Sequence, residues 1–214
     1  MRIFIDSADV SAIQECFNTR LVDGVTTNPT LIRKSGRHPH DVYNELKVLG
    51  VQDISMEVSG TGLEMVTAGK ELSDIYGDVA TIKVPCTREG LDACRILSQC
   101  GIKTNVTLIF SAAQAILAAK AGATYVSPFV GRLDDQSVAG LEVVRSITGL
   151  YSMHAVQTQV LAASIRSVQR VVRSYYNGAR VVTMPPEIFW KLYDHILTDA
   201  GMAIFEEDLR VSSI

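Results

Sequence analysis

The sequence predicts an α/β fold in which eight parallel strands alternate with helices, and three observations lead to this prediction. Short runs rich in β-branched and aromatic residues recur along the chain, and segments with apolar residues at helical spacing lie between them. Strict alternation of this kind is typical of parallel sheets. The 214 residues divide into eight units of about 27 residues, which is compact but sufficient for a single (β/α)8 barrel, the TIM barrel. A doubly wound open sheet is the alternative.

The predicted strands are short and evenly spaced. They are Ile3 to Asp6, Gly24 to Asn28, Ile54 to Val58, Val79 to Val84, Thr104 to Ile109, Thr124 to Phe129, Gln157 to Ser164 and Ala179 to Met184. Helical spacing between them is clearest in the sets Leu63, Val66, Leu72 and Ile75, then Leu91, Cys94 and Leu97, then Val168, Val171, Val172 and Tyr175. Glycines at positions 101, 122, 178 and 201 mark helix ends between units.

No linker rich in proline, glycine or serine divides the chain, so we expect one barrel domain over residues 1–214. After the eighth strand, Pro185 and Pro186 are compatible with the first turn of a helix, and apolar residues continue to Leu197. We therefore expect an additional C-terminal helical segment over about residues 186–210. This segment either packs on a neighbouring subunit, which would make the protein a homo-oligomer, or covers its own barrel.

The composition excludes several classes of protein. With 47% hydrophobic residues, the chain has enough apolar side chains for a full core. A net charge of −3 provides no basic field for a nucleic acid or an anionic membrane, so an anionic partner must be small and held by local arginines. Asp6 follows the N-terminus closely, and no apolar run approaches the roughly 18 residues of a membrane span. We expect a cytoplasmic protein.

The cysteines and histidines do not predict a metal site. The four cysteines form no CxxC pair and have no histidine at zinc-ligand spacing, so reduced thiols are expected. His38 and His40 flank a proline without an accompanying carboxylate cluster, and a solvated loop accounts for them. We predict neither a metal nor an organic cofactor.

Lys83 is the strongest indication of function, because it lies in a run of strand formers from Val79 to Val84. Alternation in a strand directs its side chain opposite to those of Ile82 and Val84, into the barrel. A buried lysine needs ion-pair partners or a chemical role. This residue is therefore the first candidate for catalysis.

The same alternation, with bulky aliphatic residues assigned to the face under the helices, predicts the other inward side chains. They are Phe4, Asp6, Thr26, Asn28, Ser55, Glu57, Asn105, Thr107, Ser127, Phe129, Ser164 and Thr183. Polar and aromatic members gather near the C-terminal ends of the strands, where barrel enzymes hold their catalytic groups. Taken singly, Asp6, Asn28 and Thr107 also have structural explanations as a cap, a turn residue and a donor to a backbone carbonyl.

A desolvated lysine beside two carboxylates predicts Schiff-base chemistry, because a neutral amine attacks a carbonyl carbon. One of the carboxylates of Asp6 and Glu57 would move a hydroxyl proton during carbon–carbon cleavage. The other would shuttle protons as the imine forms and hydrolyses. A structural ion pair of the lysine is the main alternative, although desolvation makes the burial of charges for stability alone unfavourable.

Two loops on the same rim predict a phosphate site. Arg132 follows the sixth predicted strand, while Ser164 and Arg166 lie at the end of the seventh, where a helix begins. The alternative for Arg132 is a surface ion pair with Asp134 or Asp135. The glycine patterns of dinucleotide and P-loop sites are absent, so no nucleotide cofactor is implied.

Six segments in order along the chain carry a resemblance to a known family. They are Phe4 to Asp9, Gly24 to Pro29, Ile82 to Pro85, Asn105 to Ser111, Ser127 to Arg132 and Ala162 to Arg166. With them the chain resembles the transaldolases of the small subfamily that also contains fructose 6-phosphate aldolase. The resemblance covers nearly the whole length. It implies a (β/α)8 barrel, a cytoplasmic enzyme of the pentose phosphate pathway, and pentamers or decamers that exchange C-terminal helices.

The resemblance also implies roles for individual residues. Lys83 would be the Schiff-base lysine and Asp6 the acid/base at the C4 hydroxyl of the substrate, while Glu57 and Thr107 would hold the catalytic water. The substrate-binding residues would be Thr26, Asn28, Asn105, Ser127 and Phe129, of which Asn28 and Asn105 bind the dihydroxyacetone part. The phosphate would be held by Arg132, Ser164 and Arg166. No role is implied for His154.

Three positions favour a transaldolase over an aldolase. The aldolase branch tends to carry glutamine in place of Glu57 and tyrosine in place of Phe129, and it lacks the asparagine that corresponds to Asn105. A phenylalanine cannot donate the proton that releases a bound dihydroxyacetone enamine, so the enamine would wait for an aldose phosphate. We therefore predict transfer of a dihydroxyacetone unit from sedoheptulose 7-phosphate or fructose 6-phosphate to an aldose phosphate. The alternatives are a fructose 6-phosphate aldolase that releases free dihydroxyacetone, and a non-catalytic sugar-phosphate-binding barrel.

Overall fold

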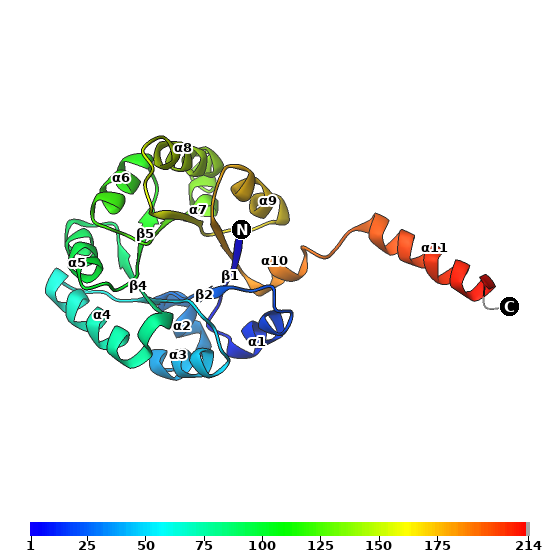
Figure 1. The fold of residues 1–214 in the computed structure, drawn as a ribbon, viewed down its shortest axis with the longest axis horizontal. Helices are drawn as coiled ribbons and strands as arrows, with labels where there is room; N and C mark the ends of the chain where they lie inside the picture. The colour runs from blue at the N-terminus through cyan, green and yellow to red at the C-terminus, as the bar shows by residue number, and fades with distance from the viewer. Residues whose placement is uncertain (213–214) are drawn as a thin grey trace.

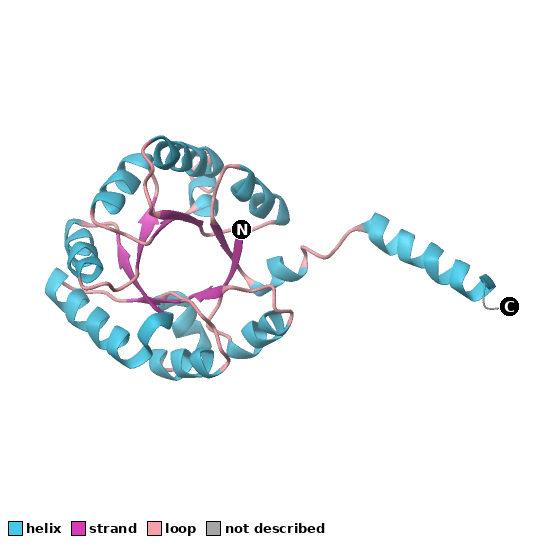
Figure 2. Ribbon diagram, in the orientation of Figure 1, coloured by secondary structure: helices cyan, strands magenta, loops and turns pink. Residues whose placement is uncertain are grey.

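The computed structural model describes residues 1–212, and its eight strands form a closed parallel barrel (Figures 1 and 2). The strands are β1 (Arg2–Asp6), β2 (Gly24–Thr26), β3 (Ile54–Glu57), β4 (Ala80–Pro85), β5 (Thr104–Ile109), β6 (Tyr125–Pro128), β7 (Gln159–Ala162) and β8 (Val181–Met184). They pair in sequence order, and β8 closes the barrel on β1. The predicted (β/α)8 barrel is confirmed, and the open-sheet alternative was wrong.

Helices follow each strand, and most of them cover the outside of the barrel, whereas α11 extends away from it (Figure 2). They are α1 (Val10–Asn18), α2 (Pro29–Ser35), α3 (Pro39–Val48), α4 (Gly62–Tyr76), α5 (Arg88–Gln99), α6 (Ala112–Lys120), α7 (Val130–Asp134), α8 (Gly140–Met153), α9 (Val168–Tyr176), α10 (Pro186–Trp190) and α11 (Ile196–Ser212), with a 3-10 turn at Gly77–Val79. Side-chain caps define many of the starts. Asp9, Thr61 and Ser111, for example, each accept a bond from a backbone N–H of the helix that follows. None of the described helices combines the length and apolar character that crossing a membrane requires.

Two hydrophobic clusters follow from the alternation of side chains along the strands. The larger one lies between the strands and the helices and includes Ile5, Ile82 and Val84, all fully buried. The smaller one lies inside the barrel and consists of Phe4, Tyr125, Leu161, Ala163 and Val181, with Phe129 packed against it. The inside of the barrel is therefore filled by packed side chains.

A polar network closes the N-terminal end of the barrel around the buried carboxylate of Asp53. The hydroxyls of Thr81 and Tyr125 donate to it at 2.7 and 2.8 Å. Lys103 lies 3.6 Å from the same carboxylate, and Arg2 lies 4.0 Å away. Because this carboxylate is surrounded by donors and cations, its burial is compensated at this end of the barrel.

The C-terminal segment differs from a single barrel-covering helix. Helix α10 packs against α1 and β1 and its Phe189 is buried, but α11 extends away from the barrel (Figure 1). Apolar side chains on α11, including Ile196, Leu197 and Phe205, are exposed. The alternative in which the segment covers its own barrel was therefore wrong for α11.

Candidate active site

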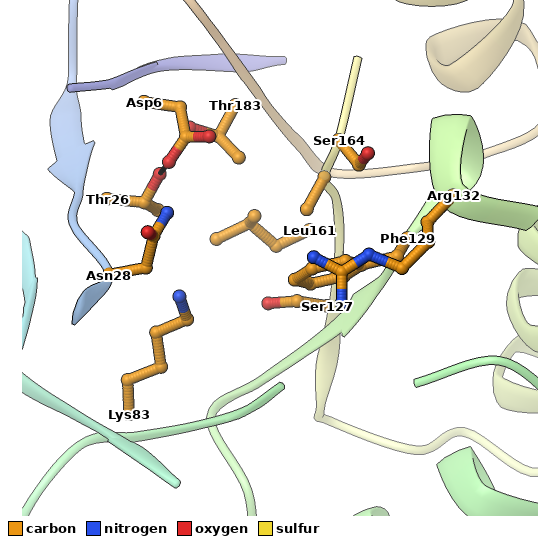
Figure 3. A pocket seen from close by; sticks show the side chains of 11 residues that line it. Asp6, Thr26, Asn28, Lys83, Ser127, Phe129, Arg132, Leu161, Ser164 and Thr183 are labelled. Carbon is orange, nitrogen blue, oxygen red and sulfur yellow. Dashed lines mark hydrogen bonds between the residues drawn. The ribbon is translucent and has the colours of Figure 1, made fainter. Parts of the chain in front are cut away.

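A pocket opens at the C-terminal ends of the strands, and Figure 3 shows the side chains that line it. Nine sequence-predicted residues take part, namely Asp6, Thr26, Asn28, Lys83, Ser127, Phe129, Arg132, Ser164 and Thr183. Leu161 and Ala163 complete the lining. The predicted residues Glu57, Asn105, Thr107 and Arg166 lie outside this lining. Residues from strands far apart in the sequence thus meet at one site.

Lys83 is 4% exposed, and its ammonium has two close partners. Its Nζ lies 2.9 Å from Oε2 of Glu57 and donates to the backbone carbonyl of Thr27, also at 2.9 Å. Glu57 and Lys83 are register partners on β3 and β4, so the strand pairing itself brings them together. Two contacts hold the amine at the floor of the pocket, where the chain can present it to a ligand carbonyl (Figure 3).

Asp6 faces the same pocket from β1 and is held by two threonine hydroxyls in series. Thr26 donates to Oδ1 of Asp6 at 2.8 Å, and the hydroxyls of Thr26 and Thr183 lie 2.6 Å apart (Figure 3). Burial raises the pKa of the Asp6 carboxyl above its ordinary value, against the opposing effects of Lys83 and the Thr26 hydrogen bond. A carboxyl with a raised pKa is a stronger base once ionised, which suits it to accept a proton from a ligand hydroxyl.

Asn105 is fully buried and lies below the pocket, between two serines. Its Nδ2 donates to Oγ of Ser55 at 3.2 Å, and its Oδ1 accepts from Oγ of Ser127 at 2.5 Å. Asn105 is also the register partner of Lys83 on the neighbouring strand. The amide of Asn105 therefore orients Ser127. Of these three hydrogen-bonded side chains, only Ser127 lines the pocket.

Thr107 has a buried hydroxyl without a hydrogen-bond partner among the residues that the structure describes. A buried hydroxyl normally finds a protein or water partner, so Oγ1 of Thr107 is available to bind a water or a ligand oxygen. Thr107 is the register partner of Pro85 at the C-terminal end of β4, two residues beyond Lys83. This geometry suits the predicted water site.

Asn28 combines a structural contact with a place in the pocket. It is the N-cap of α2, and its Oδ1 accepts from the backbone N–H of Leu31 at 3.0 Å. The structural explanation considered for this residue was a turn before Pro29, and its contact is a helix cap instead. Its amide nitrogen has no partner within residues 1–212, and the side chain lies beside Lys83 in Figure 3. The cap fixes the side chain while leaving donors for a ligand.

The two predicted phosphate-binding arginines have different surroundings. The guanidinium of Arg132 lies over the ring of Phe129, with Cζ 4.8 Å from the ring centroid, and lines the pocket. No ion pair involves Arg132 in the described part of the chain. Arg166 instead forms a two-fold hydrogen-bonded ion pair with Asp135 outside the pocket lining. The surface pairing considered for Arg132 was wrong, since Asp135 binds Arg166 and Asp134 lies 3.0 Å from Arg170.

Gly131 explains how the two rim loops approach each other. Its N–H donates to the carbonyl of Ser164 at 2.9 Å, and a Cβ at this position would lie 2.3 Å from that oxygen and 2.8 Å from Nε of Arg166. Any side chain would push the loops apart. The glycine therefore sets the position of Arg132 relative to Ser164.

Ser164 lines the pocket, but strand alternation was the wrong reason to expect it there. Strand β7 ends at Ala162, and the pocket is lined by Leu161 of this strand and by Ala163, which follows it and bridges to Phe129. Ser164 reaches the pocket because its backbone is left-handed, with φ of 57°. The apolar residues Leu161 and Ala163 were missed, because aliphatic side chains were assigned to the helix-covered face.

The cysteines and histidines lie outside this pocket. Cys16, Cys86, Cys94 and Cys100 are free thiols. His40 is within 3.0 Å of the hydroxyl of Tyr76 and stacks on His38, so this pair forms a local cluster at the start of α3. No group of three or more histidines, cysteines or acids within the described residues has a geometry that could hold a metal ion.

Fold and site together define a (β/α)8 barrel with a buried, carboxylate-paired lysine at the C-terminal ends of its strands. Comparison with known proteins places this barrel in one family. The family model for transaldolase/fructose-6-phosphate aldolase matches residues 3–212, and the chain belongs to that family. The family supports an enzyme of the aldolase or transaldolase kind.

Several relatives match along almost their whole length. A probable transaldolase of Ruegeria pomeroyi is 46% identical over 215 residues, which cover 100% of this chain and 99% of the relative. A probable transaldolase of Caulobacter sp. strain K31 is 50% identical, with 97% and 96% of the two chains covered. A third, from Bartonella quintana, is 48% identical, with 98% and 97% covered.

Proposed function

We propose that the protein is a transaldolase that transfers a dihydroxyacetone unit from sedoheptulose 7-phosphate or fructose 6-phosphate to an aldose phosphate. The observation that carries the proposal is the 2.9 Å contact of the buried Lys83 with Glu57, at a pocket that Lys83 and Asp6 both line. The names of the relatives support the same activity. Neither a metal nor an organic cofactor is needed for the chemistry described here.

The first half of the reaction uses Lys83 as nucleophile. Its neutral amine attacks the C2 carbonyl of the ketose phosphate, and loss of water gives an iminium. Glu57, with a water held at Thr107, shuttles the protons of this step. Asp6 then removes the C4 hydroxyl proton, the C3–C4 bond breaks, and its electrons pass to the iminium nitrogen. The first aldose phosphate leaves, and a dihydroxyacetone enamine stays on the lysine.

The second half reverses these steps on a new aldehyde. The enamine carbon attacks the aldehyde of the acceptor, Asp6 returns a proton to the new hydroxyl, and water hydrolyses the iminium. Phe129 lies at the pocket without a proton to donate, which favours retention of the enamine until the acceptor arrives. Arg132 lines the pocket and forms no ion pair within 4.0 Å among the described residues, which supports a role in binding the phosphate at the rim.

Trapping of the intermediate tests the proposal. Borohydride is added to the protein with fructose 6-phosphate, and peptides are analysed by mass spectrometry for a reduced three-carbon adduct. We expect the adduct on Lys83 and its loss in Lys83→Met, whereas Lys70→Met, which removes an exposed lysine of α4, retains it. Absence of the adduct from Lys83 would refute Schiff-base catalysis. An assay for free dihydroxyacetone without an acceptor separates the transaldolase from the aldolase.

We also propose that the protein acts in the cytoplasm, in the pentose phosphate pathway, as a pentamer or decamer. The assembly is supported by α11, whose apolar side chains are exposed on a helix that leaves its own barrel (Figure 1). Exposed apolar surface on this scale favours burial against another subunit. The small sugar phosphates are the proposed partners, and the net charge of −3 argues against nucleic acid and anionic membrane.

A further inference from the structure

Strand β5 contains an irregularity directly beside the pocket. Val106 pairs with Val126, and Ile109 pairs with Pro128, so Thr107 and Leu108 on β5 lie opposite the single residue between those partners on β6. One extra residue in a strand is a β-bulge, and bulges often redirect side chains next to active sites. Leu108 has a left-handed backbone with φ of 58°, which leucine rarely adopts.

The bulge reverses the alternation of side chains after Thr107. In a regular strand Ile109 would share the inward face of Thr107, and Phe110 would point toward the helices. Instead, Ile109 is fully buried in the outer core cluster. The ring of Phe110 meets that of Phe129 in an edge contact, with centroids 5.9 Å apart. Phe110 was missed by the sequence prediction because a bulge is invisible to a period-two rule.

Two backbone hydrogen bonds, one at Phe110 and one at the preceding residue, fix the position of Phe110. Its N–H donates to Oε1 of Gln114 at 2.8 Å, in the first turn of α6. The preceding carbonyl, of Ile109, accepts from the N–H of Phe129 at 3.1 Å. The same segment therefore holds both the backbone and the ring of Phe129, and Arg132 rests over that ring.

We propose that Phe110 is a positioning residue for phosphate binding, placed by the left-handed backbone of Leu108. Phe110 buttresses the Phe129 ring, and that ring holds the Arg132 guanidinium over the pocket by cation–π contact. This inference rests on the proposed function, in which Arg132 binds the substrate phosphate. Phe110 has no contact of its own with the phosphate in this arrangement.

The first test compares Phe110→Leu with Phe17→Leu, which removes another half-buried phenylalanine, from α1. Inorganic phosphate is titrated into each protein by calorimetry, a readout independent of catalysis. Loss of a cation–π support is expected to weaken phosphate binding about tenfold in Phe110→Leu only. In Phe110→Leu, kcat/KM for the acceptor should fall by a similar factor with erythrose 4-phosphate. It should stay unchanged with erythrose, which has no phosphate. Equal phosphate affinity in the two variants would overturn the proposal.

The second test separates the backbone of Leu108 from its packing. Glycine adopts the left-handed conformation freely, whereas a β-branched valine resists it. We expect Leu108→Gly to retain phosphate affinity and Leu108→Val to lose it, with Leu141→Val of α8 as a control at a half-buried helical leucine. A packing role predicts the opposite order, because valine is closer in size to leucine. That opposite order would overturn the assignment to the bulge.

These measurements also distinguish failure of the inference from failure of the proposed function. If no borohydride adduct forms on Lys83 while phosphate affinity depends on Phe110 as described, the transaldolase proposal fails and the positioning role stands. If the adduct forms and phosphate affinity is indifferent to Phe110, the positioning role fails alone.

Discussion

Oε2 of Glu57 lies 2.9 Å from Nζ of Lys83, and the two residues are direct partners in the pairing of β3 with β4. A one-residue shift of this register would direct one side chain to the opposite face. The contact therefore depends on the pairing of the strands as much as on the charges. It makes the carboxylate the nearest acid to the proposed nucleophile.

Glu57→Gln is expected to lower kcat while leaving Lys83 able to form the imine. The amide keeps the shape of the side chain but cannot shuttle protons, and general acid–base catalysis contributes about 10²-fold or more. The measurement is steady-state transfer from fructose 6-phosphate to erythrose 4-phosphate, together with slow borohydride trapping of the variant. The control is Glu142→Gln, which alters an exposed acid of α8. An unchanged kcat in Glu57→Gln would contradict the role in proton transfer.

Asp6→Asn is expected to stabilise the protein at neutral pH while abolishing transfer. A carboxyl whose pKa is raised on folding stabilises the folded state below its unfolded pKa, and this contribution is lost as pH rises through the folded pKa. The raised pKa of Asp6 thus predicts a higher Tm for the variant at pH 7. The difference should disappear below the ordinary value of 3.8. Thermal unfolding of both proteins across pH provides the measurement, and a lower Tm of Asp6→Asn at pH 7 would contradict the assigned effect of burial.

The raised pKa of Asp6 also predicts the pH dependence of activity. Asp6 must be ionised to accept the C4 hydroxyl proton, so kcat/KM for the ketose phosphate should fall on the acid side at a pH above 3.8. Thr26→Val removes a hydrogen bond that lowers this pKa, so the acid limb should move to higher pH. A pH profile of both proteins checks the direction. Movement to lower pH would be inconsistent with a hydrogen bond that stabilises the carboxylate.

Phe129→Tyr is expected to increase release of free dihydroxyacetone from fructose 6-phosphate without an acceptor. The phenol would place a proton donor at the pocket beside the enamine, with an expected increase of about tenfold or more. Phe129→Leu is the matched control, since it disturbs the ring without supplying a proton. A coupled assay for dihydroxyacetone gives the rates. If both variants release dihydroxyacetone at the same rate, proton donation by a phenol at this position does not distinguish an aldolase from a transaldolase.

A chain that ends at Asp194 is expected to have a lower assembly mass than the full chain of 23.3 kDa subunits. The truncation removes α11, whose exposed side chains include Met202 and Phe205. Light scattering after size-exclusion chromatography measures the mass. Leu63→Ser in the full chain, at another exposed apolar position, is the control. An unchanged assembly mass after truncation would assign the subunit contacts to the barrel alone.

Much of the site was accessible from the sequence because alternation along a strand is a local property. The inward directions of Lys83, Glu57 and Asp6 follow from the apolar residues on either side of each. In the structure Lys83 and Asp6 line the pocket, and Glu57 contacts Lys83. Alternation does not account for Ser164, because this residue lies outside a strand. Strand β7 stops at Ala162, and the serine reaches the pocket through a left-handed backbone instead.

The sequence by itself determined the (β/α)8 barrel and the inward lysine, because strand and helix periodicities depend on neighbours along the chain. Only the tertiary structure decided that Phe110 turns toward Phe129, that Asp135 binds Arg166, and that α11 leaves the barrel. The bulge at Leu108 depends on the pairing of β5 with β6, and the ion pair depends on the approach of two loops. These features arise from contacts between segments distant in sequence, which no periodicity encodes.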